Sequence, residues 1–321
     1  MPPMANTLHK TFRTVDVGSG DDGRWAGLIR ETYPPEALAG WLTEEGRTDE
    51  GARAARRLFE THLPELVPAL DRLRAGLADI PHTGTLLTLA AVRPFYAGCT
   101  QIGAGGELLR NYDFDPDEVE GSIVRSHLLR PVIGTQEGGW GLLDGMNDAG
   151  LAISLTFGGR KVHGPGFAVV IVIRYLLETC TTVDEALARL RTLPITVPQN
   201  LTLVDPHRAV TVHLGPDIPL TEAPDACAAN HQSEPVPPEQ ERETRTGERL
   251  AAVRAAGPDV AAMLRPPLHH GGYDRGFGTV YTAHYRPAEG AVTYHWPAAD
   301  SWSLSFGTFT EETRTVRLGA V

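Results

Sequence analysis

The chain has 321 residues, with 40 acidic side chains, 29 basic ones and 12 histidines, which gives a formal net charge of −11. Hydrophobic residues make up 41% and charged residues 21%, a composition typical of a folded globular protein. The acidic balance disfavours a nucleic-acid partner, which needs basic surface to neutralise phosphates. Lys10 and Lys161 are the two lysines, and neither stands in a phosphate-binding GK[ST] loop or a PLP-type signature.

The cysteine and apolar patterns indicate a reduced, soluble protein. Cys99, Cys180 and Cys227 are too few and too scattered for a disulfide framework, and no Cys or His spacing suggests zinc. The N-terminus lacks a basic-then-apolar signal pattern. The longest apolar run, residues 167–173, is far shorter than the roughly 20 residues that span a bilayer. We therefore expect a cytoplasmic location, no metal, no cofactor and no membrane partner.

The first hundred residues are predicted to be mainly helical after one short strand over 11–17. Residues 18–23 then match the G-x-G-x-x-G pattern of dinucleotide sites, but Asp21 and Asp22 would place two negative charges where pyrophosphate binds. A tight turn is the better interpretation. Leucines at positions 58, 63, 66, 70, 73 and 77 have helical spacing, and Pro64 predicts a division between two helices.

From residue 99 onward, strand-like segments flank turn residues. Four hairpins are predicted: 99–103 with 108–114, 140–146 with 151–157, 201–204 with 209–214, and 279–285 with 291–296. Helices are expected over 167–179, from Thr182 onward and over 246–256, and a surface loop over 233–240. Because the helices stand between hairpins, the pattern indicates antiparallel sheets covered by helices, an α+β fold.

Cys99 opens this strand-rich part, between Gly98 and Thr100. One interpretation is a buried, inert thiol. The other is a nucleophile that becomes N-terminal when the Gly98–Cys99 bond is cleaved, since glycine leaves its carbonyl open to attack by the sulfur. Hydrolysis of the resulting thioester frees an α-amine, whose reference pKa of roughly 7.7–8.0 suits a base near neutral pH.

Arg110 and Asp113 follow on the second strand of the first hairpin. A cation close to a thiol lowers the thiol pKa, which is the role open to Arg110. Asp113 can accept a hydrogen bond from the α-amine. The alternative is a surface ion pair, worth about 0–1 kcal/mol.

The segments Gly-Cys-Thr at 98–100 and Arg-Asn-Tyr-Asp-Phe at 110–114 resemble the peptidase C45 group of N-terminal-nucleophile hydrolases. These are the acyl-CoA:6-aminopenicillanate acyltransferase-like proteins, relatives of choloylglycine (bile salt) hydrolase and penicillin V acylase. Further matches follow in order at 145–154, 229–231, 279–283 and 294–297. The resemblance covers most of the chain, and residues 12–98 are similar to the family's pro-segment.

The resemblance implies roles for individual residues. Cys99 is the nucleophile and its freed amine the base, while Arg110 and Asp113 match the residues that position and activate the cysteine. Asn230 matches the asparagine whose side-chain amide donates to the oxyanion.

Two further catalytic assignments are less direct. Thr156 is the nearest match to a residue that supplies a backbone N–H to the oxyanion. Arg249 is similar to a late active-site arginine, with Arg245 as a rival and a solvated helix face as the structural alternative.

The implied fold is a four-layer αββα sandwich, in which two antiparallel sheets lie between helical layers. Residues 1–98 are expected to form the pro-segment of a zymogen and 99–321 the catalytic core, together in one structural domain. After cleavage, the fragments 1–98 and 99–321 are expected to stay associated. A substrate pocket is expected between the segment before Cys99 and residues 158–161.

The implied reaction is hydrolysis of a linear, non-peptide C–N amide of a small molecule through an acyl-thioester on Cys99. Acyl transfer to an amine, from an amide or from a thioester such as acyl-CoA, is the close alternative, because either water or an amine can intercept the same thioester. Two other classes stay open: an uncleaved Cys–His thiol hydrolase that pairs Cys99 with His231 or another histidine, and a non-catalytic binding protein.

Overall fold

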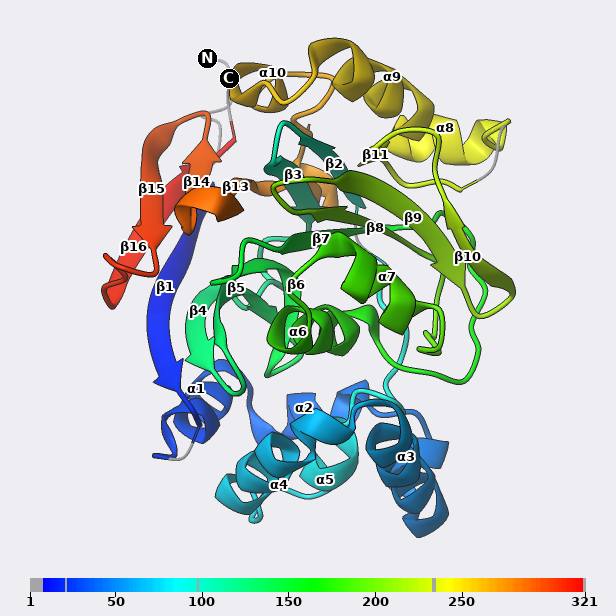
Figure 1. The fold of residues 1–321 in the computed structure, drawn as a ribbon, viewed down its shortest axis with the longest axis vertical. Coiled ribbons are helices and arrows are strands. Elements are labelled where there is room, and N and C mark those ends of the chain that lie inside the picture. Colours follow the sequence, from blue (N-terminus) through cyan, green and yellow to red (C-terminus); the bar gives the residue numbers. More distant parts are fainter. Residues whose placement is uncertain (1–7, 21, 97, 233–234, 320–321) are drawn as a thin grey trace.

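The computed structural model describes residues 8–20, 22–96, 98–232 and 235–319. Within these ranges the strands form two sheets, with helices on the outer side of each (Figure 1). The larger sheet has nine described strands, in the order β10 (Ile218–Glu222), β9 (Ala209–Gly215), β8 (Gln199–Val204), β7 (Ala152–Phe157), β6 (Gly141–Asn147), β5 (Pro131–Glu137), β4 (Ser122–His127), β1 (Leu8–Gly18) and β16 (Glu312–Leu318).

The smaller sheet is antiparallel and carries the cysteine. Its order is β11 (Cys227–Ala228), β2 (Gly98–Ala104), β3 (Glu107–Phe114), β13 (Phe277–Arg286), β14 (Ala291–Trp296) and β15 (Ala299–Ser305), and β12 (Gly271–Gly272) pairs with β13. Strands β2 and β3 pack against β7 and β8 of the larger sheet, so the two sheets lie face to face.

Helices cover both outer faces. Those over the smaller sheet are α8 (Pro238–Thr244), α9 (Thr246–Ala256) and α10 (Val260–Met263), and those beside the larger sheet are α6 (Val169–Thr179) and α7 (Val183–Leu190). In Figure 1 the layers run from α8–α10 through the two sheets to α6 and α7. The αββα order expected from the resemblance is confirmed.

Residues before Cys99 supply one strand and a further group of helices. The helices are α1 (Arg24–Thr32), α2 (Pro35–Trp41), α3 (Asp49–His62), α4 (Val67–Gly76) and α5 (Thr83–Leu86), with 3-10 turns η1 (Glu45–Arg47) and η2 (Pro64–Leu66). Figure 1 places α2–α5 beyond α6. The Trp140 ring, fully buried, joins these parts because it stacks on Phe59 at 6.0 Å and meets Trp25 edge-on at 6.4 Å.

The predicted hairpins are confirmed as β2–β3, β6–β7, β8–β9 and β13–β14, the last closed by η4 (Pro287–Glu289). Gly105 and Gly106 turn the first hairpin with φ values of 61° and 79°, which favour glycine. Pro64 does separate α3 from α4. Residues 18–20 end β1 in a turn before α1, while Asp21 lies outside the described residues.

One prediction is wrong in part. Of the surface loop expected over 233–240, Ser233 and Glu234 lie outside the described residues, and Pro238 begins helix α8. Proline suits the first turn of a helix because its missing N–H would have no helical acceptor there. Across the described ranges, no helix has both the length and the apolar character needed to cross a membrane.

Candidate active site

The first hairpin places Cys99 between the two sheets. Cys99 pairs with Tyr112 and Gln101 with Arg110 across the β2–β3 ladder. Side chains directly opposite each other share a face, and neighbours along a strand alternate. Cys99, Arg110 and Tyr112 therefore face the larger sheet, whereas Thr100 and Asp113 face the helical layer of α9.

Arg110 is fully buried and contacts the thiol directly. Its Nη2 donates to Cys99 Sγ at 3.1 Å, and its Nε donates to the Leu155 carbonyl at 3.0 Å. Its Nη1 donates to an Asp144 carboxylate oxygen and, at 3.0 Å, to the Tyr281 hydroxyl. The guanidinium also lies 4.7 Å from the centre of the Tyr112 ring. Arg110 is thus held in one orientation with a donor on the sulfur.

Burial and charge act on this thiol in opposite directions. Burial raises the pKa of the Cys99 thiol, the Arg110 cation lowers it, and the Asp113 carboxylate raises it again. Burial would also lower the pKa of Arg110, but Cys99, Tyr281 and Asp144 around it raise that pKa well above its usual value. Arg110 therefore stays charged beside a thiol whose pKa lies above its ordinary value.

Arg249 approaches the cysteine from the helical layer. From α9, its Nη1 donates to the Cys99 carbonyl and to the Thr100 hydroxyl, each at 2.8 Å, and to Asp113 Oδ2 at 3.2 Å. Burial lowers the pKa of Arg249, while Asp113 opposes that shift. The Thr279 hydroxyl holds the other Asp113 oxygen at 2.6 Å. The Asp113 carboxylate thus accepts hydrogen bonds from both Arg249 and Thr279.

Asn230 contacts the backbone nitrogen of the cysteine. Cys99 N donates to Asn230 Oδ1 at 3.0 Å, and Arg249 Nη2 donates to the same oxygen at 2.7 Å. The Asn230 Nδ2 donates to the Phe157 carbonyl at 3.2 Å, and the Asn230 N–H donates to the Thr246 hydroxyl at 2.6 Å. The sulfur and nitrogen of Cys99 therefore each meet a different polar side chain.

The structure also places Thr156 and the two rival arginines, Arg245 and Arg249. Thr156 donates its hydroxyl to the Ala229 carbonyl at 2.8 Å, next to Asn230, and accepts from Asn200 Nδ2 at 3.0 Å. Arg245 lies on the surface and pairs with Glu248 at 2.6 Å, so Arg249 is the arginine that reaches the cysteine.

His231, the histidine considered as a partner for Cys99, lies beside Thr246. His231 Nδ1 is 2.8 Å from the Thr246 hydroxyl. Among the described residues, the side-chain donor on Cys99 Sγ is Arg110 and not a histidine.

A cavity of about 450 Å³ opens beside the Gly98–Cys99 bond. Tyr96 and Gly98 line it from before the cysteine, with Gly159, Lys161 and Asn230 on other sides. The structure thus brings together the two segments expected to border a substrate pocket. A Cβ atom on Gly98 would overlap the ring of Phe277, so this position has no room for a side chain.

Sequence reasoning missed the residues that hold Arg110 in place. Asp144 accepts hydrogen bonds from Arg110, Tyr281 and Tyr285, the two tyrosine contacts being 2.7 and 2.5 Å. All four side chains are buried. The available signal was a lone carboxylate inside the otherwise uncharged strand β6. Across the described ranges, no group of three His, Cys, Asp or Glu residues is arranged to hold a metal ion.

Comparison with known proteins gives one family match. Residues 103–300, which include Arg110, Asp113, Asn230 and Arg249 and begin after Cys99, match the family described as acyl-coenzyme A:6-aminopenicillanic acid acyl-transferase. No curated protein sequence matches the chain significantly.

Several solved structures are similar to the chain at low sequence identity. A mutant of the conjugated bile acid hydrolase from Clostridium perfringens is 12% identical, over 69% of this chain and 97% of that chain, with a TM-score of 0.45. Penicillin V acylase from Agrobacterium tumefaciens is 13% identical, over 70% and 84%, with a TM-score of 0.41. A Caenorhabditis elegans N-acylethanolamine-hydrolyzing acid amidase ortholog is 14% identical, over 60% and 92%, with a TM-score of 0.38.

Proposed function

Because the chain belongs to the acyl-coenzyme A:6-aminopenicillanic acid acyl-transferase family, we propose that it breaks a linear, non-peptide C–N amide bond through an acyl-thioester on Cys99. The observation that carries the proposal is the environment of this one residue. Its sulfur accepts from the buried Arg110 at 3.1 Å, while its nitrogen donates to Asn230 at 3.0 Å. The Cys99 sulfur, as the nucleophile, and the Cys99 nitrogen, as the prospective base, thus each contact a different side chain.

The first step of the proposal is self-cleavage. Cys99 Sγ attacks the Gly98 carbonyl carbon, the Gly98–Cys99 C–N bond breaks, and the nitrogen takes up the thiol proton. Water then hydrolyses the thioester, which restores the thiol and leaves a carboxylate on Gly98 and a free amine on Cys99. The contact between Arg110 and the sulfur supports this step, because a nearby cation favours the thiolate.

The second step uses the new amine. It accepts the Cys99 thiol proton, the thiolate attacks the substrate carbonyl, and the substrate's C–N bond breaks as the amine product leaves with that proton. Water then releases the acid. We assign the oxyanion to the side-chain amide of Asn230, whose Nδ2 bonds the Phe157 carbonyl in the uncleaved chain. In this proposal the substrate oxygen takes the place of that carbonyl.

Acyl transfer is the second candidate. The family is described as an acyl-transferase acting with acyl-coenzyme A, which favours a thioester donor and an amine acceptor. The chemistry up to the acyl-Cys99 thioester is shared, and an amine then attacks in place of water. Product analysis with and without an added amine separates the two reactions.

Intact-mass analysis and N-terminal sequencing test the proposal. The purified chain should give two fragments, 1–98 and 99–321, whose masses sum to the full chain plus one water. Cys99→Ala should stay a single chain and show no turnover of amide substrates, because it lacks the sulfur. Cys180→Ala removes another buried thiol, which contacts the Thr179 hydroxyl, and should behave as the unsubstituted protein.

Two results would overturn the proposal. One is an unbroken 321-residue chain that turns over amides, since the α-amine would then not exist. The other is a Cys99→Ala variant that is cleaved and active like the unsubstituted chain.

A further inference from the structure

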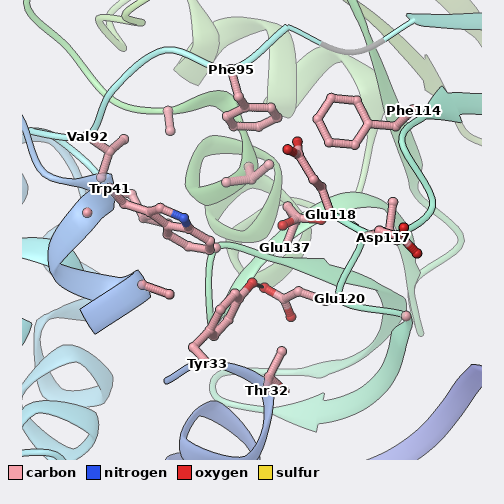
Figure 2. Close-up of a pocket in the computed structure, with 18 of the residues that line it drawn as sticks. Thr32, Tyr33, Trp41, Val92, Phe95, Phe114, Asp117, Glu118, Glu120 and Glu137 are labelled. Carbon is pink, nitrogen blue, oxygen red and sulfur yellow. Dashed lines mark hydrogen bonds between the residues drawn. The ribbon is translucent and has the colours of Figure 1, made fainter. Parts of the chain in front are cut away.

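A cavity of about 870 Å³ lies on the other side of the segment that leads to Cys99 (Figure 2). Aromatic side chains form much of its wall. Tyr33 and Trp41 meet edge-on at 4.6 Å, and Phe114 stacks on Tyr112 at 5.9 Å. Phe95 completes the aromatic wall, four residues before the cysteine. The volume and lining suit a small organic ligand with an apolar body.

Carboxyl groups distinguish this cavity from an ordinary apolar pocket. Two guanidinium groups line the cavity, those of Arg13 and Arg93. Five carboxyl groups line it: Glu31, Asp117, Glu118, Glu120 and Glu137. Arg13 is already paired with Glu31 at 3.1 Å, and Arg93 is exposed. Figure 2 shows Glu118, Glu120 and Glu137 opposite Trp41 and Val92. The wall is therefore acidic as well as aromatic.

Glu120 and Glu137 differ in their hydrogen bonds. Glu120 accepts from the Tyr33 hydroxyl, from Gln136 Nε2 at 3.0 Å and from the Gly139 N–H at 2.9 Å. The Glu137 Oε2 atom is buried and has no hydrogen-bond partner among the described residues. A buried polar atom without a partner is costly, so a donor is missing at this point of the wall.

The charge balance around Glu137 also favours a cation. Burial raises the pKa of Glu137 well above its usual value, and the neighbouring Glu120 raises it further. Lys10 opposes the shift, but its ammonium donates to the carbonyls of Pro116 and Val119, at 2.6 and 2.5 Å. A positively charged ligand group would oppose these shifts, because a nearby positive charge lowers the pKa of a carboxyl group and favours its ionised form.

We infer that this cavity binds a ligand with a protonated amine on an apolar or aromatic body. The ammonium group occupies the position beside Glu137 Oε2, where it donates the missing hydrogen bond. The body packs against Trp41, Tyr33 and Phe95, whose ring faces also attract a cation.

The cavity is lined by a strand neighbour of the proposed nucleophile, so we assign its ligand to part of the substrate. Tyr112 lines the cavity and pairs with Cys99 in the β2–β3 ladder. Residues 93–95 line this cavity, while Tyr96 and Gly98 line the cavity that contains Asn230. The substrate class is therefore an amide that carries a cationic group, a step that rests on the proposed function. Binding itself does not depend on turnover.

Three probes of matched shape test the inference: phenylbutylamine, phenylbutanol and phenylbutyrate. None contains an amide, so the purified protein binds them without cleaving them. Isothermal titration should give the tightest binding for the amine, roughly tenfold or more above the alcohol, because a charge-assisted hydrogen bond and cation–π contacts are added. The carboxylate should bind most weakly, since it meets like charges.

Substitutions place the binding in this cavity. Glu137→Gln should remove most of the preference for the amine and leave the affinity for the alcohol unchanged. Glu36→Gln removes the same charge from the exposed side of α2 outside the cavity and should keep the preference. If Glu137→Gln does not fold, Trp41→Leu provides a second variant, which should weaken binding of all three probes.

Equal affinity for amine and alcohol, or no binding of any probe, would overturn the inference in the unsubstituted protein. So would a full preference for the amine in Glu137→Gln. These results leave the proposed function intact if Cys99→Ala is still uncleaved and inactive. Conversely, an active Cys99→Ala variant removes the proposed function but not the amine site.

Discussion

Two buried arginine–carboxylate pairs in this chain are alike in burial and in their aromatic contacts, but the two arginines donate to different further groups. Arg110 pairs with Asp144 between the sheets, and Arg174 pairs with Glu178 at 3.4 Å on α6. All four side chains are buried, and each guanidinium lies over an aromatic ring, at 4.7 Å from Tyr112 and 4.9 Å from Trp25. Burial, pairing and aromatic stacking therefore do not distinguish the two.

The two pairs differ in the other groups to which each guanidinium donates. Arg174 donates to the Trp140 carbonyl at 2.8 Å and to the Ser126 hydroxyl at 2.6 Å, groups that do not ionise. Burial lowers its pKa to about 10, and Glu178 opposes the shift without cancelling it. Arg110 instead donates to the Cys99 thiol, and the ionisable groups around it raise its pKa. A buried ion pair indicates chemistry when its cation also contacts a nucleophile.

The largest expected effect comes from replacing each arginine by methionine. Arg110→Met and Arg174→Met should each lower the free energy of unfolding by about 3–5 kcal/mol, because each leaves a buried carboxyl group unpaired. Arg110→Met should also reduce the turnover rate per folded molecule on the order of 1000-fold, since the thiolate loses its cation. Thermal unfolding and turnover at a temperature where both variants are folded provide the comparison. Equal rates in the two variants would show that the contact with Cys99 gives Arg110 no role in turnover.

Asn230→Ala should have the next largest effect. The variant should fold, yet its rate should fall by about 100-fold or more, as is usual when an oxyanion donor is removed. Asn200→Ala is the control, because Asn200 is buried nearby but bonds Thr156 and the Ala229 carbonyl rather than Cys99. Steady-state kinetics should show a loss only for Asn230→Ala. An unmodified rate in that variant would show that Asn230 is not the oxyanion donor.

The smallest expected effect concerns the tyrosines that hold Asp144. Tyr281→Phe removes a hydroxyl that contacts both Arg110 and Asp144, so we expect a rate loss of no more than about tenfold and a stability loss of about 1 kcal/mol. Tyr285→Phe removes contacts to Asp144 and to the Tyr294 hydroxyl but none to Arg110, so it should cost stability with little change in rate. A larger rate loss for Tyr285→Phe would reverse the proposed order of influence on Arg110.

Local sequence signals predicted much of the fold, but they did not predict which strands pair over long sequence distances. Turn residues such as Gly105 and Gly106 identify a hairpin because they act within a few residues. Nothing local predicts that β1 lies between β4 and β16, since β1 pairs residues near 13 with residues near 313. Strand β16 was accordingly not predicted, and the β4–β5 hairpin was missed although its two strands are close in the sequence.

The candidate site likewise contains residues whose proximity the sequence predicts and residues that only the packing of the sheets brings together. Cys99, Arg110 and Asp113 share one hairpin, so their proximity follows from the sequence, and Asn230 and Arg249 came from the family resemblance. Asp144 lies on the other sheet, and its contact with Arg110 exists only because the sheets stack. No local pattern contains that information. The side-chain contacts of Thr156 likewise depend on how the strands pack, and they are to Ala229 and Asn200.

The position of β1 has a consequence for a chain cut before Cys99. This strand is parallel to β4 on one side and antiparallel to β16 on the other, so it is the connection between them in the larger sheet. A 99–321 polypeptide made alone would lack that strand and would present two unsatisfied sheet margins, which invite aggregation. If cleavage occurs as proposed, the N-terminal fragment would have to stay bound to complete the larger sheet, and recombinant production would have to begin from the full-length chain.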